Sequence, residues 1–393
     1  MYNFDEFVER KNTHSLKYDG IKERFGIDDN DLLPLWVADM DFKTPEPIRS
    51  ALKNKIDEGI LGYSGGYEDV YESIISWYKR RHDLTLKREW IEFSGTVVSS
   101  LARIIKTFTN EGDKIIVQPP VFSNFYDLIR MNNRQVIENP LILKDGKYNM
   151  DLDGLKNIID EKVRMIILCN PHNPVGRAWS KDELSELTKI LVDNNILIVS
   201  DEAHCELVHK GYNHNFVLQQ HEEAIENSIT CIASHKTFNI AGLEISNVII
   251  PNEYLRKRYK QALLSESINK PNLLGLTAVK AGFDHCGEWL DEMLDYVESN
   301  FVYMEEFFKE NIPCIKVIPA EAMFLAWLDF RALNLTPKEI EKLLITEGKV
   351  LVNQGYYFGK GGEGFIRINL ACPKSTLKDA LERVLKAINT LKN

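Results

Sequence analysis

Three short polar motifs follow apolar runs in the middle of the chain and carry many of its reactive side chains. They are Cys-Asn-Pro-His-Asn-Pro-Val-Gly at 169–176, Ser-Asp-Glu-Ala-His at 200–204 and Ser-His-Lys-Thr-Phe-Asn at 234–239. In an open α/β sheet, ligands bind outside the carboxyl ends of the strands. If the apolar runs are strands of one sheet, the side chains that follow them converge on one ligand. Taken singly, each motif is more typical of a turn, a solvated lysine or a structural histidine.

A fourth candidate is Arg367, which lies in the alternating sequence Phe-Ile-Arg-Ile-Asn-Leu at 365–370. A strand there places Arg367 and Asn369 on one face and the isoleucines on the other. A guanidinium held on a rigid strand is suited to two-point capture of a carboxylate. The alternative is a surface salt bridge, which the sequence alone favours.

The segment Ser-Gly-Thr-Val-Val-Ser-Ser at 94–100 precedes an amphipathic run at 101–108. A glycine turn that feeds a helix offers free amides and a partial positive charge to an anion such as phosphate. The segment matches neither Gly-x-Gly-x-x-Gly nor a Walker loop. The sequence Gly-Lys-Gly-Gly-Glu-Gly at 359–364 also fails the Walker pattern, and we interpret it as a flexible loop.

The elements that must position these residues alternate in type. Between about residues 90 and 250, short apolar runs alternate with helical-length stretches, which favours parallel strands with covering helices. The runs at 165–169 and 196–200 are continuously apolar, as is typical of strands buried on both faces. Ser180-Lys-Asp-Glu183 predicts a capped helix between them and hence a βαβ unit. The predicted strands are 114–118, 163–169, 196–200 and 229–233.

The last third of the chain differs. Helical patterns extend over 255–309, and strands are predicted at 324–329 and 365–370 around a helix that begins at Thr336-Pro337. This order predicts a smaller α+β domain at the C-terminus, with a boundary near residue 285.

Composition excludes several classes of protein. Of 393 residues, 44% are hydrophobic, which is enough for a sizeable core and rules out global disorder. A formal net charge of −10 provides no basic surface, so neither nucleic acid nor an anionic membrane is an expected partner. No segment resembles a signal peptide or a membrane span. The six cysteines form no Cys-x-x-Cys pair and the histidines have no metal-ligand spacing, so we expect a cytoplasmic protein without a metal.

Together these motifs resemble those of the fold type I pyridoxal-phosphate enzymes, and more closely the MalY/PatB-type cystathionine β-lyases and carbon–sulfur lyases. The resemblance covers nearly the whole chain. Its motifs lie at 35–42 (Leu-Trp-Val-Ala-Asp-Met-Asp-Phe), 62–63 (Gly-Tyr), 169–176, 200–204, 236–243 and 364–369. It implies an α/β chain with the aspartate aminotransferase-like fold. A large domain at 45–285 would hold a mostly parallel seven-stranded sheet, and 1–44 with 286–393 would form a smaller α+β domain.

The resemblance also implies roles for three charged residues. Lys236 would form the Schiff base with pyridoxal 5'-phosphate and, once freed, remove the α-proton of the substrate. Asp201 would pair with the pyridinium nitrogen, so that the ring acts as an electron sink. Arg367 would bind the α-carboxylate of an amino-acid substrate. Around the ring, Asn173 would hydrogen-bond the hydroxyl, with His204 nearby.

The phosphate would sit on the amides of Thr96 and Val97, with Ser234 or Thr237 near it. In this family the tyrosine of the Gly-Tyr motif reaches the phosphate of the neighbouring subunit, so Tyr63 implies a homodimer with shared active sites.

The chain departs from the family pattern at three positions. Thr96 replaces the glycine of Pro-Gly-Val-Val, and a threonine tolerates positive φ poorly. His235 stands where relatives commonly have a serine before the lysine. Phe122, in Pro-Pro-Val-Phe at 119–122, replaces a tyrosine and would stack on the cofactor ring without a phenol.

The implied activity is β-elimination, which converts L-cystathionine or another S-substituted cysteine to pyruvate, ammonia and a thiol such as homocysteine. An aminotransferase of the same fold is the first alternative, because it shares every step up to loss of the α-proton. A requirement for a 2-oxo acid acceptor distinguishes it. A second alternative is a regulatory protein, because MalY-type members can also bind a transcription activator.

Overall fold

The larger of two main sheets has seven strands. The computed structural model describes residues 2–268 and 270–392 of the chain. The strand order is β2 (Ile91–Ser94), β10 (Ser246–Ile249), β9 (Ser228–Ile232), β8 (Leu197–Asp201), β7 (Val163–Cys169), β3 (Lys114–Val117) and β4 (Gln135–Glu138). All neighbours pair in parallel except β10, which runs antiparallel to β2 and to β9. The predicted α/β class with a mostly parallel seven-stranded sheet is confirmed.

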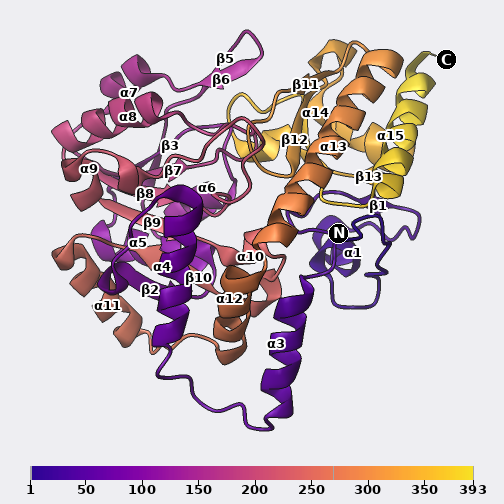
Figure 1. The fold of residues 1–393 in the computed structure, drawn as a ribbon. Coiled ribbons are helices and arrows are strands. Elements are labelled where there is room, and N and C mark those ends of the chain that lie inside the picture. Colours follow the sequence, from indigo (N-terminus) through magenta and orange to yellow (C-terminus); the bar gives the residue numbers. More distant parts are fainter. Residues whose placement is uncertain (1, 269, 393) are drawn as a thin grey trace.

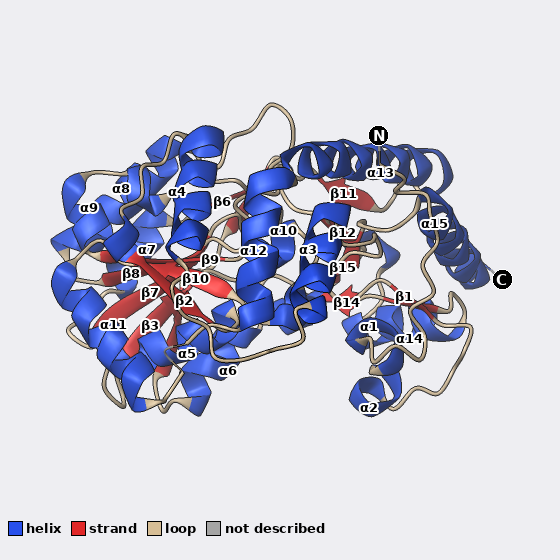
Figure 2. Cartoon of the chain, turned by 60° about the horizontal axis from the view of Figure 1, so that its bottom comes forward, coloured by secondary structure: helices blue, strands red, loops and turns tan. Residues whose placement is uncertain are grey.

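Helices cover both faces of this sheet (Figure 2). One face packs against α5 (Val97–Phe108), α6 (Asn124–Met131) and α11 (Glu253–Ser265), and the other against α7 (Leu152–Ile158), α8 (Lys181–Asp193) and α9 (Glu222–Glu226). Within β7, Met165 and Ile167 join the first core, whereas Ile166 and Leu168 join the second. The central strands are therefore buried on both faces, which explains their continuously apolar sequences.

Two predicted helix starts are confirmed in detail. The hydroxyl of Ser180 accepts a hydrogen bond from the amide of Glu183, whose carboxylate accepts one from the amide of Ser180. Thr336 and Glu339 form the same capping box at α14 (Pro337–Thr346). The predicted strands agree with β3, β7, β8 and β9 to within one residue at either end.

The smaller sheet is antiparallel and belongs mainly to the C-terminal third. Its order is β11 (Lys316–Ile318), β12 (Leu325–Asp329), β15 (Phe365–Asn369) and β14 (Asn353–Gln354). It is accompanied by α13 (Gly287–Asn311), α14 and α15 (Lys374–Asn389). β1 (Leu33–Pro34) pairs in parallel with β13 (Val350–Leu351), so a segment from the N-terminal part of the chain lies beside one from the C-terminal part (Figure 1). The division at 45 and 285 stays a prediction, and its terminal residues 1 and 393 lie outside the described residues.

The other elements connect these parts. The helical pattern predicted over 255–309 is divided among α11, α12 and α13. The remaining helices are α1 (Leu16–Asp19), α2 (Ile21–Phe25), α3 (Glu46–Asp57), α4 (Glu68–His82), α10 (Ser234–Thr237) and α12 (Leu273–His285), and β5 (Ile142–Lys144) pairs with β6 (Lys147–Asn149). Short 3-10 helices lie at Arg88–Trp90, Val217–Gln219, Ala241–Leu243, Arg331–Leu333, Gly355–Phe358 and Thr390–Lys392. Across the described ranges, no helix has the length and apolar character needed to cross a membrane.

The glycine-rich segment at 359–364 is a hydrogen-bonded turn. The amide of Gly362 donates to the carbonyl of Gly359, and the amide of Phe365 donates to the carbonyl of Gly362. A Cβ atom added to Gly355 would overlap the carbonyl oxygen of Gly362. Only a glycine allows this close approach, which leads the chain from β14 into β15, the strand that carries Arg367.

We expect the substitution Gly355→Ala to lower the stability of the chain by about 1–3 kcal/mol, because the added methyl group must push two backbone segments apart. The shift in thermal midpoint, measured by circular dichroism, tests this. Gly65→Ala is the matched control, because no atom lies within 4 Å of an added Cβ there and its φ is not positive. Equal midpoints for the two variants would contradict the packing described for Gly355.

Candidate active site

The carboxyl ends of β7, β8 and β9 bring the three polar motifs to one edge of the larger sheet. Asn173 follows β7, Asp201 ends β8, and Lys236 lies in α10 directly after β9. Arg367 reaches the same place from β15, where its Nη1 donates to Oδ1 of Asn173 at 2.9 Å. The charges of Asp201 and Arg367 both act on Lys236. The structure therefore brings these four predicted site residues together.

The pKa of the Lys236 amine is closer to neutral pH than that of an ordinary lysine. Its Nζ donates to the carbonyl oxygen of Ala38 at 2.6 Å. Burial lowers the pKa of Lys236 to about 8, because the charged ammonium loses its hydration, while Asp39 and Asp201 oppose this decrease and Arg367 adds to it. A substantial fraction of this amine is therefore unprotonated and nucleophilic at mildly alkaline pH.

Asp201 and Glu202 are neighbours in sequence, but their side chains contact different residues. Asp201 is buried, accepts the amide of Ala203 at 3.1 Å, and has its pKa raised to about 6 by burial. Glu202 instead accepts the Oγ of Ser200 at 2.7 Å and contacts Nε2 of His214 at 2.9 Å. Successive side chains of a strand point to opposite faces of the sheet. This alternation could have indicated from the sequence that the two carboxylates do not share one site.

Arg367 is buried, with 6% of its surface exposed. Besides Asn173, its Nη2 donates to the carbonyl of Trp36 at 3.0 Å and to Oδ1 of Asn353 at 2.6 Å. None of these hydrogen-bond partners in the described chain is a carboxylate, so the alternative of a surface salt bridge is wrong. Burial lowers the pKa of Arg367. Asn353 was missed by the sequence analysis, because only the β14–β15 pairing places it opposite Arg367.

His204 lies close enough to Lys236 and Arg367 to be influenced by their charges, and Phe122 follows β3. His204 is buried, its Nδ1 has no hydrogen-bond partner among the described residues, and its ring meets that of Phe324 edge-on at 6.2 Å between centroids. Burial, together with the cations Lys236 and Arg367, holds the pKa of His204 well below its ordinary value. Phe122 is half-buried and packs edge-on against Phe125.

The N-terminus of α5 is capped by Thr96, whose Oγ1 accepts the amide of Ser99 at 3.1 Å. Thr96 has φ −81° and ψ 159°, which is ordinary extended backbone. Thr96 therefore does not adopt the positive φ that a threonine tolerates poorly. Val97 begins the helix and is buried. Amides of this first turn face outward from the helix end, where they lack intrahelical acceptors.

The residues around Lys236 complete this edge of the site. Ser234 is buried and its Oγ has no hydrogen-bond partner in the part of the chain that the structure describes, whereas Oγ1 of Thr237 donates to the carbonyl of Ala233 at 3.5 Å. Nδ1 of His235 lies 3.4 Å from the carbonyl oxygen of Ile245, and burial lowers the pKa of this histidine to about 3. It is therefore a neutral imidazole at the position where relatives commonly have a serine.

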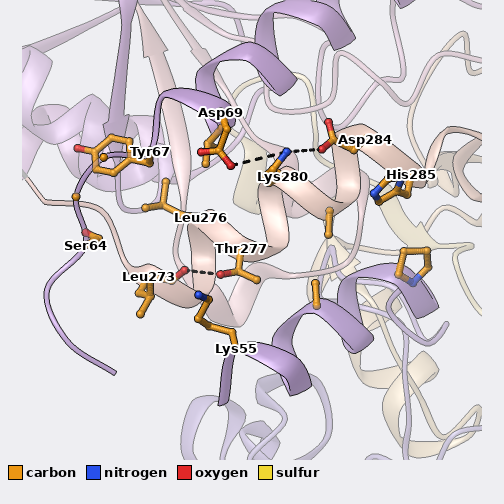
Figure 3. Close-up of a pocket in the computed structure, with 16 residues that line it drawn as sticks. Lys55, Ser64, Tyr67, Asp69, Leu273, Leu276, Thr277, Lys280, Asp284 and His285 are labelled. Atoms are coloured by element: carbon orange, nitrogen blue, oxygen red, sulfur yellow. Dashed lines mark hydrogen bonds and ion pairs between the residues drawn. The ribbon is translucent and has the colours of Figure 1, made fainter. Parts of the chain in front are cut away.

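Tyr63 lies on the surface of the single chain. Its side chain is 95% exposed, and its ring contacts Nζ of Lys270 at 5.0 Å from the centroid. The loop that carries it continues into Ser64, which borders a cavity of about 440 Å³ between α3, α4 and α12. Figure 3 shows Lys280 in this cavity between Asp69 and Asp284. Neither Lys236 nor Arg367 lines it.

Comparisons with known proteins agree with this geometry. A family model described as aminotransferase class I and II matches residues 30–384. The chain is 39% identical to cystathionine beta-lyase PatB of Bacillus subtilis (strain 168), over 98% of this chain and 100% of the relative. Its structure is similar to that of cystalysin from Treponema denticola, which contains a pyridoxal 5'-phosphate cofactor, with a TM-score of 0.96, 37% identity and 100% of both chains covered.

It is also similar to the PLP-bound C-S lyase from Staphylococcus hominis, with a TM-score of 0.92 and 32% identity over 99% of this chain and 98% of the other. The resemblance inferred from the motifs is thereby confirmed. The chain belongs to the aminotransferase class I and II family.

Proposed function

We propose that this chain is a pyridoxal 5'-phosphate-dependent carbon–sulfur β-lyase that acts on L-cystathionine or related S-substituted cysteines. The observation that carries the proposal is the convergence of Lys236, Asp201 and Arg367 at one edge of the sheet, with a hydrogen bond from Arg367 to Asn173. This chemistry requires an amine with a lowered pKa, a buried carboxyl group and a buried guanidinium. The names of the similar relatives, cystathionine beta-lyase and C-S lyase, support the same reaction.

The donor atoms present fit the cofactor. Ser234 Oγ, His204 Nδ1 and Arg367 Nε are buried and have no hydrogen-bond partner within the described chain. Buried polar atoms in native proteins are nearly always hydrogen-bonded, so three such atoms in one region indicate a place for a polar ligand. The capped N-terminus of α5 adds amides suited to a phosphate.

Each residue then has a stated role in holding the group. Lys236 would engage the aldehyde and Asp201 the ring nitrogen. Oδ1 of Asn173 is already bonded to Arg367, which leaves its Nδ2 to donate to the ring oxygen. His204 would lie beside the ring. When bound, the cofactor supplies an aldehyde carbon for amines and a sink for the electrons of a broken Cα–H bond.

The phosphate end would rest on the amides of Thr96 and Val97 and on the hydroxyl of Ser234. Thr237 can add its hydroxyl, because its present bond to Ala233 is long at 3.5 Å. Phe122 would contribute a flat apolar face to the ring.

The chain's own residues carry the proton and orient the substrate. Arg367 binds the α-carboxylate and fixes the direction of the Cα–H bond. The neutral amine of Lys236 takes that proton, the C–S bond breaks with its electrons on sulfur, and the thiolate takes up a proton as it leaves. The three-carbon remainder is hydrolysed to pyruvate and ammonia.

We also propose a homodimer and a cytoplasmic location. Ile60, Leu61 and Tyr63 are 79%, 60% and 95% exposed on the loop after α3, and so large an apolar loop is suited to contact with a second copy. In that arrangement Tyr63 would reach the phosphate site of the neighbouring subunit. All six cysteines are free and five are buried, which suits a reducing compartment. A regulatory partner stays a prediction from the resemblance alone.

The first prediction concerns the reaction itself. The purified, cofactor-loaded chain is expected to release pyruvate from L-cystathionine without any added 2-oxo acid. Lys236→Ala is expected to lower this rate by at least about 1,000-fold and to remove the visible absorbance of the lysine-bound cofactor, since no other group replaces the amine. Lys280→Ala, outside the site, is the control. Turnover that depends on an added 2-oxo acid would instead identify an aminotransferase.

The second prediction uses the pKa of Lys236, which burial lowers to about 8. Only the neutral amine attacks an aldehyde, so the rate at which the cofactor-free chain captures pyridoxal 5'-phosphate should rise about fivefold from pH 7 to pH 8 and level off above about pH 9. Stopped-flow absorbance measures this rate. Asp39→Asn should move the midpoint to lower pH, because Asp39 raises the pKa of Lys236. A midpoint near 10 in the unmodified chain would overturn the argument.

The third prediction concerns shared sites. Lys236→Ala and Tyr63→Ala homodimers are each expected to have little activity. When equal amounts are allowed to exchange subunits, a mixed dimer has one site with both native residues, so about one quarter of the unmodified activity should return. No recovery, with exchange verified by mass spectrometry, would show that Tyr63 does not serve the neighbouring site.

A further inference from the structure

One segment without helix or strand, Leu35–Phe42, lies against the candidate site and is called the strap below. Three of its consecutive carbonyl oxygens accept hydrogen bonds from side chains at the site. Arg367 donates to Trp36 at 3.0 Å, Asn369 to Val37 at 2.6 Å, and Lys236 to Ala38 at 2.6 Å. The strap is thus held on this side by the two cations on which the proposed reaction depends.

The hydrogen bonds of Arg367 leave no free edge for a substrate. A guanidinium has five N–H groups. Both hydrogens of Nη2 are used, on Trp36 O and on Oδ1 of Asn353, and Nη1 uses one on Asn173. A guanidinium can bind a carboxylate through two edges, the Nε–Nη2 edge and the Nη1–Nη2 edge. Nε has no partner among the described residues, but both edges include Nη2. A carboxylate that binds through two atoms must therefore displace a partner of Nη2, whichever edge it takes.

The contact with Lys236 changes at an earlier stage. The protonated amine has three hydrogens to donate while it is free, and fewer once it is joined to the cofactor. Cofactor binding would therefore weaken the contact with Ala38, and a substrate carboxylate that takes the place of Trp36 O would remove the contact with Arg367.

The opposite side of the strap is held by charge. Arg10 donates two hydrogen bonds to Asp39, from Nη2 to Oδ2 at 2.6 Å and from Nη1 to Oδ1 at 3.2 Å. Its Nη1 also donates to Oδ1 of Asp41 at 2.7 Å and to the carbonyl of Met40 at 3.2 Å. Lys17 donates to Oδ2 of Asp41 at 2.7 Å and lies 3.6 Å from Asp39.

This four-charge cluster is sheltered from water. The side chains of Lys17 and Asp41 are 0% and 5% exposed, and those of Arg10 and Asp39 are each 20% exposed. Charge-assisted hydrogen bonds in such surroundings are stronger than surface pairs and are little screened by salt. None of these four residues touches Arg367 through a hydrogen bond, so the cluster stays intact when Arg367 turns to a ligand.

We propose that Arg10 and Lys17 are positioning residues, which keep the strap over the site after a substrate carboxylate has displaced the carbonyl of Trp36 from Arg367. The proposal rests on the proposed function, because it takes Arg367 to be the carboxylate receptor. In the free enzyme charged side chains hold the strap at two places, the site and the charge cluster. Neutral contacts add to these: Asn369 and Asn239 bond to the strap, and the backbone of Leu35 and Asp41 bonds to neighbouring segments. In the loaded enzyme the cluster is the charged anchor that remains.

Hydrogen-exchange mass spectrometry of the cofactor-loaded enzyme tests this directly. The probe is L-alanine, which has the α-carboxylate and no leaving group on Cβ. With Arg10→Gln, we expect exchange in the strap to match the unmodified enzyme without L-alanine and to become about tenfold faster with saturating L-alanine. The unmodified enzyme should show no such acceleration. Arg10→Lys, which keeps one charged contact and loses the paired geometry, should lie between them.

Kinetics give an independent measurement. Arg10→Gln should lower kcat/KM for L-cystathionine at least about fivefold, mainly through KM, with the affinity for pyridoxal 5'-phosphate unchanged. Lys22→Gln is the matched control, because Lys22 lies on the same N-terminal arm and pairs with the exposed Asp28, at 2.6 Å. It should leave both the kinetics and the exchange unchanged.

The outcomes separate the two proposals. Faster strap exchange in Arg10→Gln both with and without L-alanine would show a general structural role and overturn the positioning proposal. Unchanged exchange in both states, with unchanged KM, would also overturn it. Absence of pyruvate release by the unmodified enzyme would instead overturn the proposed function, and the exchange experiment with L-alanine could still be evaluated.

Discussion

The hydrogen bond between Arg367 and Asn173 connects the two sheets at the candidate site. Arg367 comes from the smaller sheet and Asn173 from the loop after β7 of the larger one, and their side chains meet at 2.9 Å. A buried guanidinium is costly unless its donors are satisfied. With no carboxylate among its partners in the described chain, Arg367 must use neutral oxygens, and these are supplied by Trp36 and Asn353. The hydrogen bonds of this one side chain therefore connect both the strap and β14 to the site.

Burial also sets the electrostatics of the site. It moves Lys236 and Asp201 toward their neutral forms, with pKa values of about 8 and about 6. Each group is then receptive to a charged partner, because an opposite charge restores part of the solvation that burial removed. The ligand-free site is thus arranged for a ligand that has both an anionic end and a protonated ring, while its histidines at 204 and 235 stay neutral.

Local signals were sufficient for much of the fold and part of the site. Continuous apolar runs identified β7 and β8, and the Ser180 and Thr336 capping patterns identified two helix starts, because each depends on residues close in sequence. The antiparallel direction of β10 was not predicted, since strand direction depends on the chain's path between strands. Asn353 was missed for the same reason, because its place opposite Arg367 is created by pairing of strands. The alternation at 365–370 identified Arg367 as a candidate, but only the resemblance favoured a carboxylate receptor over a surface salt bridge.

The order in which the site's parts occur along the chain has a consequence during synthesis. Lys236 and Asp201 belong to a sheet whose strands all end by Ile249, whereas Arg367 lies on β15, close to the C-terminal helix. Protein domains form while the chain is still being made, in order from the N-terminus. A ribosome-bound fragment that ends before residue 365 therefore has the nucleophilic amine but neither the carboxylate receptor nor the completed smaller sheet. Selection of amino acids as substrates begins only when the last strand has been made.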